Sequence, residues 1–253
     1  MIVVISPAKK LDFETPAPTE KFTQLSEIEK SKRLIKELRK CDHDQISKLM
    51  KLSDSLTELN MKRYKDFKTP FNLKNAKQAM FAFKGDTYVG LDADTMKDSD
   101  INFAQKHLRI LSGLYGLVSP LDLVQPYRLE MGTKFSCEGN KNLYEYWGET
   151  ITSQLDGLLK KEKTLINLAS NEYFSAVNAK GLKADIITPA FKEKKNGEYK
   201  MVSFFAKKAR GMMSRYIIDN RIKDIDDLQS FDVDGYKFNK KLSSEKAPVF
   251  TRG

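Results

Sequence analysis

The sequence predicts an α+β fold, built as a single mixed domain over residues 1–253 with antiparallel hairpins and surrounding helices. Two buried-strand runs, Ile2–Ile5 and Thr164–Leu168, are scattered among helical patterns without regular alternation, which disfavours a doubly wound parallel sheet. Asn196-Gly197 lies between Asp185–Phe191 and Tyr199–Phe204 and is a strong hairpin signal. The chain has no internal repeat and no clear linker, so we expect one domain.

Helix signals follow the first strand in order along the chain. Ser26 and Glu29 form a capping-box pattern at the start of a helix, and Asp44 is placed to cap a second one. Leu143–Leu159 carries apolar residues at helical spacing. A last antiparallel pair is expected between Tyr236–Phe238 and Pro248–Thr251.

The segment Leu111–Gly132 predicts a helix-hairpin-helix-like element, which grips a DNA backbone without reading sequence. Its first helix is expected on Ile101, Ala104, Leu108 and Leu111. The hairpin itself would present the backbone amides of Gly113, Leu114, Tyr115 and Gly116 to a phosphate. Ser119-Pro120-Leu121-Asp122 has the features of a new helix start. The usual hairpin has one residue between its glycines and this one has two, so an ordinary turn is the alternative.

Composition favours an anionic partner. The chain has 44 Lys plus Arg against 34 Asp plus Glu, a net charge of +10. Such a surplus attracts polyanions, although it does not distinguish DNA from RNA, acidic lipid or acidic protein. Hydrophobic residues make up 40% of the sequence, enough for a substantial core.

The sequence also predicts a cytoplasmic protein that does not enter a membrane. Met1 is followed at once by a strand signal, without the basic and small-residue features of a signal peptide. No apolar run approaches the roughly 20 residues that span a bilayer. Cys41 and Cys137 are the only cysteines, and no metal-ligand spacing or cofactor motif is present, so we expect no metal and no cofactor.

The segment Ser203–Ile218 predicts an amphipathic helix with one basic face. Its cationic side chains Lys207, Lys208, Arg210 and Arg215 share that face with Gly211 and Ser214. No acidic residue lies between Glu198 and Asp219, whereas solvated faces usually mix charges. The interpretation is a DNA-binding face, and the alternative is an exposed face without a partner. Lys9, Lys84 and Arg128 could join it from loops at strand ends.

Catalysis is poorly signalled, so the catalytic residues stay unknown and the sequence leans away from an enzyme. His43 and His107 are the only histidines, and neither belongs to a nucleophile-base pattern. The carboxylates that could do acid–base work are Asp86, Asp122, Glu130 and Glu172, which the sequence does not rank.

Five segments together resemble the YaaA family of bacterial peroxide-stress proteins. They are Ser6-Pro7-Ala8-Lys9, Phe83-Lys84-Gly85-Asp86, Leu111–Asp122 with Gln125–Gly132, Asn167–Tyr173 and Ser203–Arg215, in matching order. The resemblance implies an unusual α+β fold with a basic cleft, a helix-hairpin-helix element at Leu111–Val118 and binding to DNA. It also implies protection against hydrogen peroxide and a link to limiting unincorporated iron.

The leading hypothesis is therefore a DNA-binding protein of the oxidative-stress response, with double-stranded or structured DNA as its partner and largely sequence-independent contacts. The alternative is a DNA-processing enzyme, glycosylase- or lyase-like, that pairs Lys9 or Lys84 with Asp86 or Glu172. A third class is an iron-handling protein. Few soft ligands argue against it, although an all-carboxylate site stays open.

Overall fold

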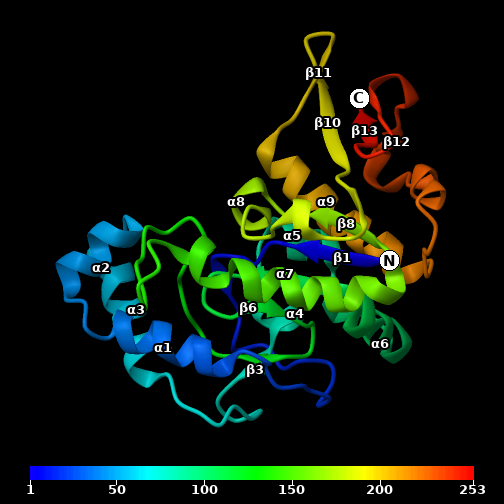
Figure 1. The fold of residues 1–253 in the computed structure, drawn as a ribbon. Helices are drawn as coiled ribbons and strands as arrows, with labels where there is room; N and C mark the ends of the chain where they lie inside the picture. The colour runs from blue at the N-terminus through cyan, green and yellow to red at the C-terminus, as the bar shows by residue number, and fades with distance from the viewer.

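The central sheet has five strands in the order β6-β5-β1-β8-β9 in the computed structural model, which describes residues 1–253 (Figure 1). Its strands are β1 (Ile2–Ile5), β5 (Leu108–Ser112), β6 (Gly116–Val118), β8 (Thr164–Leu168) and β9 (Asp185–Ile187). The pairs β5–β1, β1–β8 and β8–β9 are parallel, and β6 runs antiparallel to β5. All four residues of β1 are buried, as expected for the middle strand of a covered sheet.

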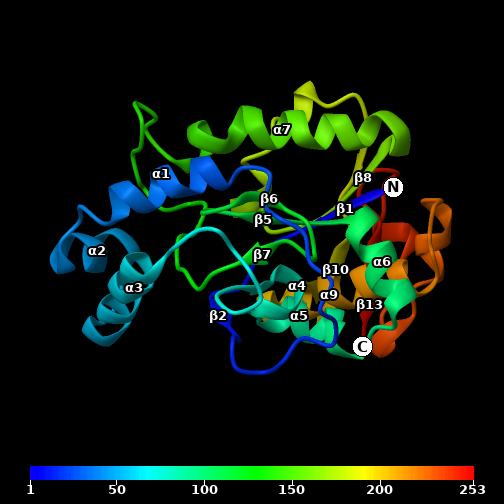
Figure 2. The same ribbon diagram turned by 90° about the horizontal axis from the view of Figure 1, so that it is seen from below.

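Helices cover both faces of this sheet. Figure 2 shows α7 (Leu143–Glu162) on one face, and α4 (Ala79–Ala82), α5 (Asp86–Leu91) and α9 (Ser203–Asp219) on the other. Trp147, on α7, is fully buried, and its indole N–H donates to the Gly113 carbonyl at 2.9 Å. The middle of the molecule therefore has a helix–sheet–helix arrangement.

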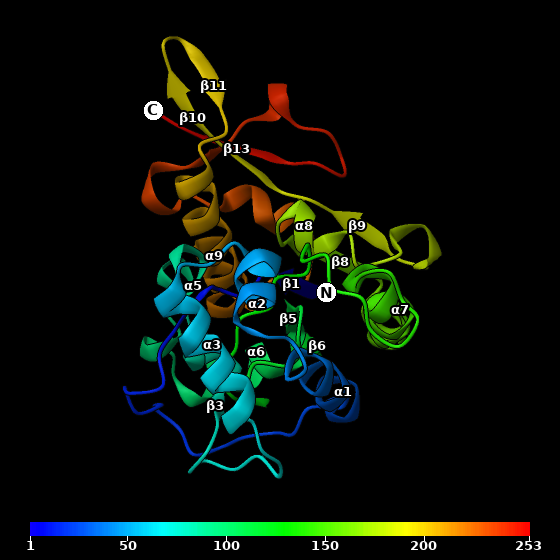
Figure 3. The ribbon, with the colours of Figure 1, turned by 90° about the vertical axis from the view of Figure 1, so that its left-hand side faces the viewer.

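Three helices form an arm beside the central sheet, facing the viewer in Figure 3. They are α1 (Ile28–Leu38), α2 (His43–Met50) and α3 (Asp54–Asp66). Asp42 caps α2 with a full capping box, and α2 ends at Lys51 in the left-handed conformation. Arg39 donates to the Tyr64 and Phe67 carbonyls, which fastens the end of α1 to the end of α3.

A second sheet lies at the C-terminal side, with the order β11-β10-β13-β12. Its strands are β10 (Ala190–Lys195), β11 (Glu198–Lys200), β12 (Lys237–Phe238) and β13 (Val249–Arg252). The tip of the β10–β11 hairpin projects from the body (Figure 1). The predicted turn at Asn196-Gly197 is confirmed, because it joins β10 to β11, and so is the antiparallel pair of β12 and β13. The strand bounds predicted around the turn are wrong: Asp185–Phe191 divides between β9 of the central sheet and the start of β10, and Tyr199–Phe204 leaves β11 at Lys200 and enters α9 at Ser203.

Shorter elements complete the chain. The remaining helices are α6 (Asp98–His107) and α8 (Asn171–Phe174), and the short strands are β2 (Lys10–Leu11), β3 (Lys77–Gln78), β4 (Phe83–Lys84) and β7 (Leu123–Val124). Five 3₁₀ turns are η1 (Ala93–Thr95), η2 (Ala179–Gly181), η3 (Asp226–Ser230), η4 (Val233–Gly235) and η5 (Lys240–Leu242). No helix has the length and apolar content needed to cross a membrane.

The α+β expectation is confirmed, but the central sheet is mostly parallel, contrary to the sequence prediction. The predicted helix on Ile101, Ala104, Leu108 and Leu111 is also wrong in its second half. α6 ends at His107, because from Leu108 onward the backbone pairs with β1, with Val3 opposite Leu108. The apolar residues at 108 and 111 fit either a helix or a strand, and pairing with the buried strand β1 decides for the strand.

The helix expected to start at Ser119 does not form either. Asp122 accepts a hydrogen bond from the Ser119 amide at 2.7 Å within a turn, and the chain then enters β7. Its other carboxylate oxygen accepts from the Thr23 hydroxyl at 2.6 Å. Burial raises the pKa of the Asp122 carboxyl. Asp122 therefore stabilises the turn at Ser119 and joins it to the loop around Thr23.

Candidate functional site

The predicted helix-hairpin-helix element at residues 111–118 is a buried β-hairpin. Ser112 pairs with Gly116 between β5 and β6, and Gly113, Leu114 and Tyr115 form the turn. Leu114 and Tyr115 are both fully buried, and their amides donate to the Ser112 hydroxyl. Amides that are buried and already bonded cannot hold a DNA phosphate, so the prediction of a backbone grip here is wrong.

Close packing explains the two glycines of this turn. A Cβ on Gly113 would lie 2.2 Å from the Leu129 carbonyl oxygen. Gly116 has a φ of +71°, and a Cβ there would lie 2.7 Å from the Trp147 ring. Both positions need glycine because backbone and indole occupy the space of a side chain.

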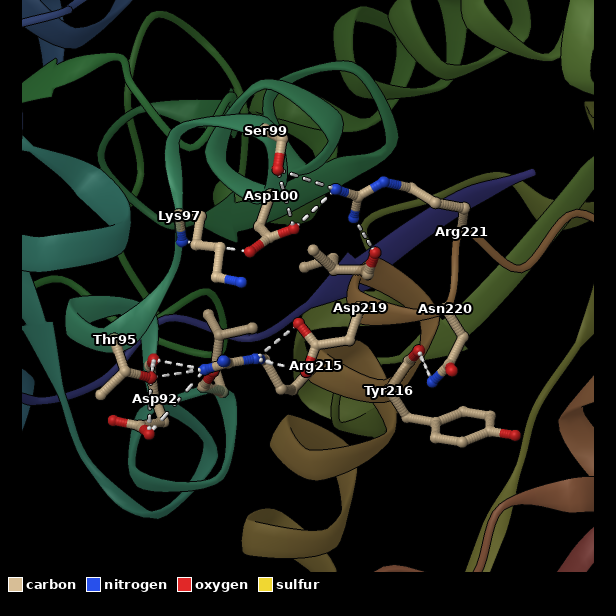
Figure 4. A network of polar contacts seen from close by, with 12 residues as sticks. Asp92, Thr95, Lys97, Ser99, Asp100, Arg215, Tyr216, Asp219, Asn220 and Arg221 are labelled. Carbon is tan, nitrogen blue, oxygen red and sulfur yellow. Dashed lines mark hydrogen bonds and ion pairs between the residues drawn. The ribbon is translucent and has the colours of Figure 1, made fainter.

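The predicted basic face of α9 is also not a free surface of one sign. Arg215 pairs with Asp219 at 2.8 Å and donates to the Asp92 carbonyl and the Thr95 hydroxyl, so it fastens α9 to the loop after α5 (Figure 4). Lys208 lies 3.4 Å from Asp234. Asp219 is the last residue of α9 and lies one turn after Arg215, whereas Asp234 comes from the η4 turn outside the helix. The acid-free stretch between Glu198 and Asp219 excludes both acids, so the local charge count missed both pairs.

Gly211 and Ser214, expected on that same face, are buried. A Cβ on Gly211 would lie 1.8 Å from the Thr87 carbonyl oxygen, and one on Gly90 would lie 2.1 Å from the Lys208 carbonyl oxygen. The two glycines therefore let the backbones of α5 and α9 touch. Close approach of another backbone was expected at Gly211, and the partner is a helix of the same chain.

Two cations of α9 have no carboxylate partner. Lys207 is exposed and forms no ion pair. Arg210 is only partly exposed, and burial lowers the pKa of its guanidinium. α9 packs against β1, β8 and α5, so these two cations belong to a helix that borders the central sheet.

The carboxyl ends of β1 and β8 are the topological switch point of the central sheet. From β1 the chain continues to β5 on one side, whereas from β8 it continues to β9 on the other side. Ligands of open parallel sheets bind where connections leave in opposite directions like this. Ser6 follows β1 and Ser170 follows β8. The Ser170 amide donates to Ser6 Oγ at 2.8 Å, and Ser6 Oγ donates to Ser170 Oγ at 3.3 Å.

Three segments close a ring around this point, which we call the strand-end ring: residues 6–9, 130–132 and 170–172. The two serines join the first segment to the third. Glu172 accepts from the Gly132 amide at 3.1 Å, and Lys9 Nζ lies 3.3 Å from Glu130 Oε1. Arg128 Nε lies 3.2 Å from the same Glu130 oxygen. The structure thus brings Lys9, Arg128, Glu130 and Glu172 of the predicted residues together.

A layer of buried tyrosines lies beneath the ring. Tyr88 donates to the Ser6 carbonyl at 3.2 Å, and Tyr127 shares a hydrogen bond of 2.7 Å with Ser112. Burial raises the pKa of Tyr88, Tyr127 and Tyr173, and the proximity of Tyr127 raises the pKa of the other two further. The raised pKa keeps these phenols neutral, and Tyr88 positions the backbone of the ring through its hydrogen bond to Ser6.

Lys84 and Asp86 lie beside the ring, in a groove of about 870 Å³ between α3 and α5. Lys84 pairs with Asp94 at 2.7 Å and lies 3.8 Å from Asp12. The predicted pairing of Lys84 with Asp86 or Glu172 is therefore not seen, because the lysine is held by two other carboxylates.

Two further grooves adjoin each other along α1 and α3, and their lining is strongly basic. We call the cations that line them the basic surface: Lys32, Arg33, Lys36, Arg39, Arg63, Lys65, Lys68 and Lys74. Glu29 and Asp66 are the only acids in the same linings. Sequence reasoning missed this surface because its cations are spread over two helices and a loop, mixed with acids that point elsewhere.

The fold and these sites define an α+β protein with a mostly parallel central sheet, a ring of polar side chains at its strand ends and a basic surface on a helical arm. Residues 1–242 match a family model described as peroxide stress protein YaaA. A UPF0246 protein of Aliivibrio fischeri is 54% identical over all of this chain and 98% of its own length. A UPF0246 protein of Colwellia psychrerythraea is 53% identical over all of this chain and 99% of its own length. The chain belongs to this YaaA family of peroxide-stress proteins, as its five segments predicted.

Proposed function

We propose that this protein binds double-stranded or structured DNA during the response to hydrogen peroxide, through the basic surface along α1 and α3. The contacts are to the sugar-phosphate backbone, so binding is largely independent of sequence. The family assignment supports the peroxide role, and the basic surface supports the choice of DNA as partner.

The observation that carries this proposal is the imbalance of charge in two adjoining grooves. Eight cations line them against two acids, whereas the whole chain has 44 cations against 34 acids. Lys65, Lys68 and Lys74 are exposed and form no ion pair within the chain. Unpaired lysines on a concave surface attract phosphates and release the counterions that surround DNA.

The α2–α3 pair consists of two helices joined by a short connection, so it supports a helix-hairpin-helix contact with DNA away from residues 111–118. Only Lys51, Leu52 and Ser53 connect the two helices, and Lys51 has a positive φ of 52°. Lys48 and Lys51 are exposed at this connection. We propose that the connection contacts the backbone of DNA that lies along α3, in the role that the sequence had given to residues 111–118.

The link to unincorporated iron is part of the same proposal. Free ferrous iron and peroxide damage DNA, so a protein of peroxide defence gains from acting at the DNA surface. We expect the iron effect to be lost when the basic surface is removed, because these cations would hold the protein at the DNA phosphates.

The test compares two triple variants with the same change of charge. Lys65→Ala/Lys68→Ala/Lys74→Ala removes three cations of the basic surface, and Lys160→Ala/Lys161→Ala/Lys183→Ala removes three exposed cations elsewhere. In both variants 41 cations remain against 34 acids, so the net charge falls from +10 to +7. Duplex affinity is measured from about 50 to 200 mM salt, the range over which phosphate contacts weaken most clearly.

We expect the first variant to bind several different duplexes more weakly, and the slope of log K against log salt to flatten by about 0.9 for each lost phosphate contact. The second variant should bind like the wild type. Equal weakening in both variants would assign the effect to net charge alone and would remove the basic surface from the proposal.

A further inference from the structure

The strand-end ring and the groove beside it have a composition that DNA binding does not explain. Lys9 in the ring and Arg128, which contacts Glu130 from beside it, contribute two positive charges, and Glu130 and Glu172 contribute two negative charges, so their charges cancel. A phosphate backbone would approach Glu172, which is exposed, and would be repelled by it. The ring is therefore suited to a different kind of ligand from the basic surface.

The ring offers donors and acceptors close together. Ser6 is oriented by the Ser170 amide and directs its own proton to Ser170 Oγ, so the hydroxyl hydrogen of Ser170 stays free to donate. Glu172 accepts one hydrogen bond, from Gly132, and retains lone pairs for more. Neighbouring hydroxyl groups, which both donate and accept, match this arrangement.

The adjoining groove of about 870 Å³ has a mostly charged lining in which exposed apolar side chains also take part. Gly85 and Lys10 line it, and a Cβ on Gly85 would lie 3.1 Å from the Ala8 Cβ, so the segment after β1 forms a wall shared with the ring. Leu59 on α3 is 42% exposed and Val89 on α5 is 63% exposed, and both line the groove. Large apolar side chains left in solvent within one groove indicate a ligand with an apolar part.

We propose that the strand-end ring and this groove bind a small, uncharged, polyhydroxylated molecule of the nucleoside class. The sugar hydroxyls contact Glu172 and Ser170, and the flat base lies against Leu59 and Val89. The site lies at the switch point between β1 and β8, the place at which open parallel sheets commonly bind ligands. The strand-end ring contains no residue of the basic surface, and Arg63 is the one cation that lines both the groove and that surface. Variants of Ser170 and Glu172 and variants of Lys65, Lys68 and Lys74 therefore test the two sites independently.

The test is isothermal titration of the full-length protein with adenosine and with uridine. We expect saturable one-to-one binding of at least one of them, and weaker binding of its 2′-deoxy form because a hydroxyl contact is lost. The corresponding 5′-monophosphate should bind no more tightly than the nucleoside, because the ring has no net charge. Absence of saturable binding by both nucleosides overturns the proposal, as does a monophosphate that binds at least about tenfold more tightly.

Variants assign the binding to the ring. Ser170→Ala and Glu172→Gln should each weaken nucleoside binding about tenfold, as expected for a lost hydrogen bond involving a charged or oriented partner. Ser175→Ala alters an exposed serine just after α8, outside the ring, and should bind like the wild type. Unchanged binding in both ring variants overturns the assignment.

A last comparison separates this proposal from the DNA proposal. Ser170→Ala and Glu172→Gln should keep the duplex affinity of the wild type, and Lys65→Ala/Lys68→Ala/Lys74→Ala should keep its nucleoside affinity. Competition between duplex DNA and nucleoside would place DNA across the ring and overturn the separation of the two sites.

Discussion

Gly211 on α9 leaves no room for a side chain, because a Cβ there would lie 1.8 Å from the Thr87 carbonyl oxygen. Its place in an otherwise helical segment predicted a close approach by another backbone, which the structure confirms. The approaching backbone belongs to α5 rather than to DNA. Sequence reasoning identified the requirement for space, but the partner depends on the tertiary packing of α5 and α9, which no local pattern encodes.

We therefore predict opposite effects for two glycine-to-alanine changes in helices. Gly211→Ala should lower the free energy of unfolding by about 1–3 kcal/mol, because the new Cβ forces α5 and α9 apart. Gly157→Ala on α7 meets nothing within 4 Å and should raise it by about 0.5–1 kcal/mol through helix propensity. Urea unfolding of both variants measures this. A Gly211→Ala protein as stable as the wild type would show that the contact between α5 and α9 is loose.

At the scale of elements, the N-terminal loop is held by side chains of β3. Lys77 donates to the Asp12 and Thr15 carbonyls at 3.0 and 2.7 Å, and Gln78 donates to the Thr19 and Lys21 carbonyls. The Asp12 carboxylate in turn accepts from the Glu14 and Thr15 amides. The loop is ordered by these polar contacts, and few of its residues are buried.

The acid stability of this loop follows from Asp12. Hydrogen bonds from Thr15, with smaller contributions from Glu14 and Lys77, lower the pKa of the Asp12 carboxyl from 3.8 to about 2. A lowered pKa in the folded state gives stability that is complete above the unfolded value and is lost as the pH falls toward about 2. Asp12→Asn should therefore be less stable than the wild type at pH 5, and the difference should shrink steadily down to pH 2.

Urea unfolding at a series of pH values measures that difference. Asp232→Asn is the control, because Asp232 is exposed and its carboxylate forms neither a hydrogen bond nor an ion pair. A difference between Asp12→Asn and wild type that stays constant with pH would mean that the carboxylate is not stabilised by the folded loop.

Elements were predicted best where the signal is local. The Asn196-Gly197 hairpin and the strands at Ile2–Ile5 and Thr164–Leu168 follow from residues that are adjacent in sequence. The parallel pairing of β1 with β8 was missed because the two strands are separated by about 160 residues, and the interval contains seven helices and six strands instead of a single crossover helix. The strand-end ring depends on that pairing, so its carboxylates could be named but not ranked.

At the scale of the whole molecule, one hydrophobic core extends from Met1 to Phe250. It includes residues of the central sheet, the arm and the C-terminal sheet. Phe250 is fully buried in an aromatic cluster with Phe191 and Phe231, at ring-centroid distances of 5.7 and 5.5 Å. We expect one domain over residues 1–253. Because one core joins the C-terminal cluster to the central sheet, the two should unfold together.

The only tryptophan provides a test of this cooperative unfolding. Trp147 lies between α7 and the β5–β6 turn, far in sequence from the C-terminal cluster, and its fluorescence reports the central sheet. Phe250→Ala should cost about 3–5 kcal/mol, because it removes a buried aromatic ring. If the core is one cooperative unit, the urea midpoint observed by Trp147 fluorescence falls together with the midpoint observed by far-ultraviolet circular dichroism.

Phe22→Ala, at a ring that is 43% exposed, should shift neither midpoint appreciably. A Trp147 midpoint that stays at the wild-type value in Phe250→Ala would divide the chain into two folding units, with the boundary between the central sheet and the C-terminal sheet.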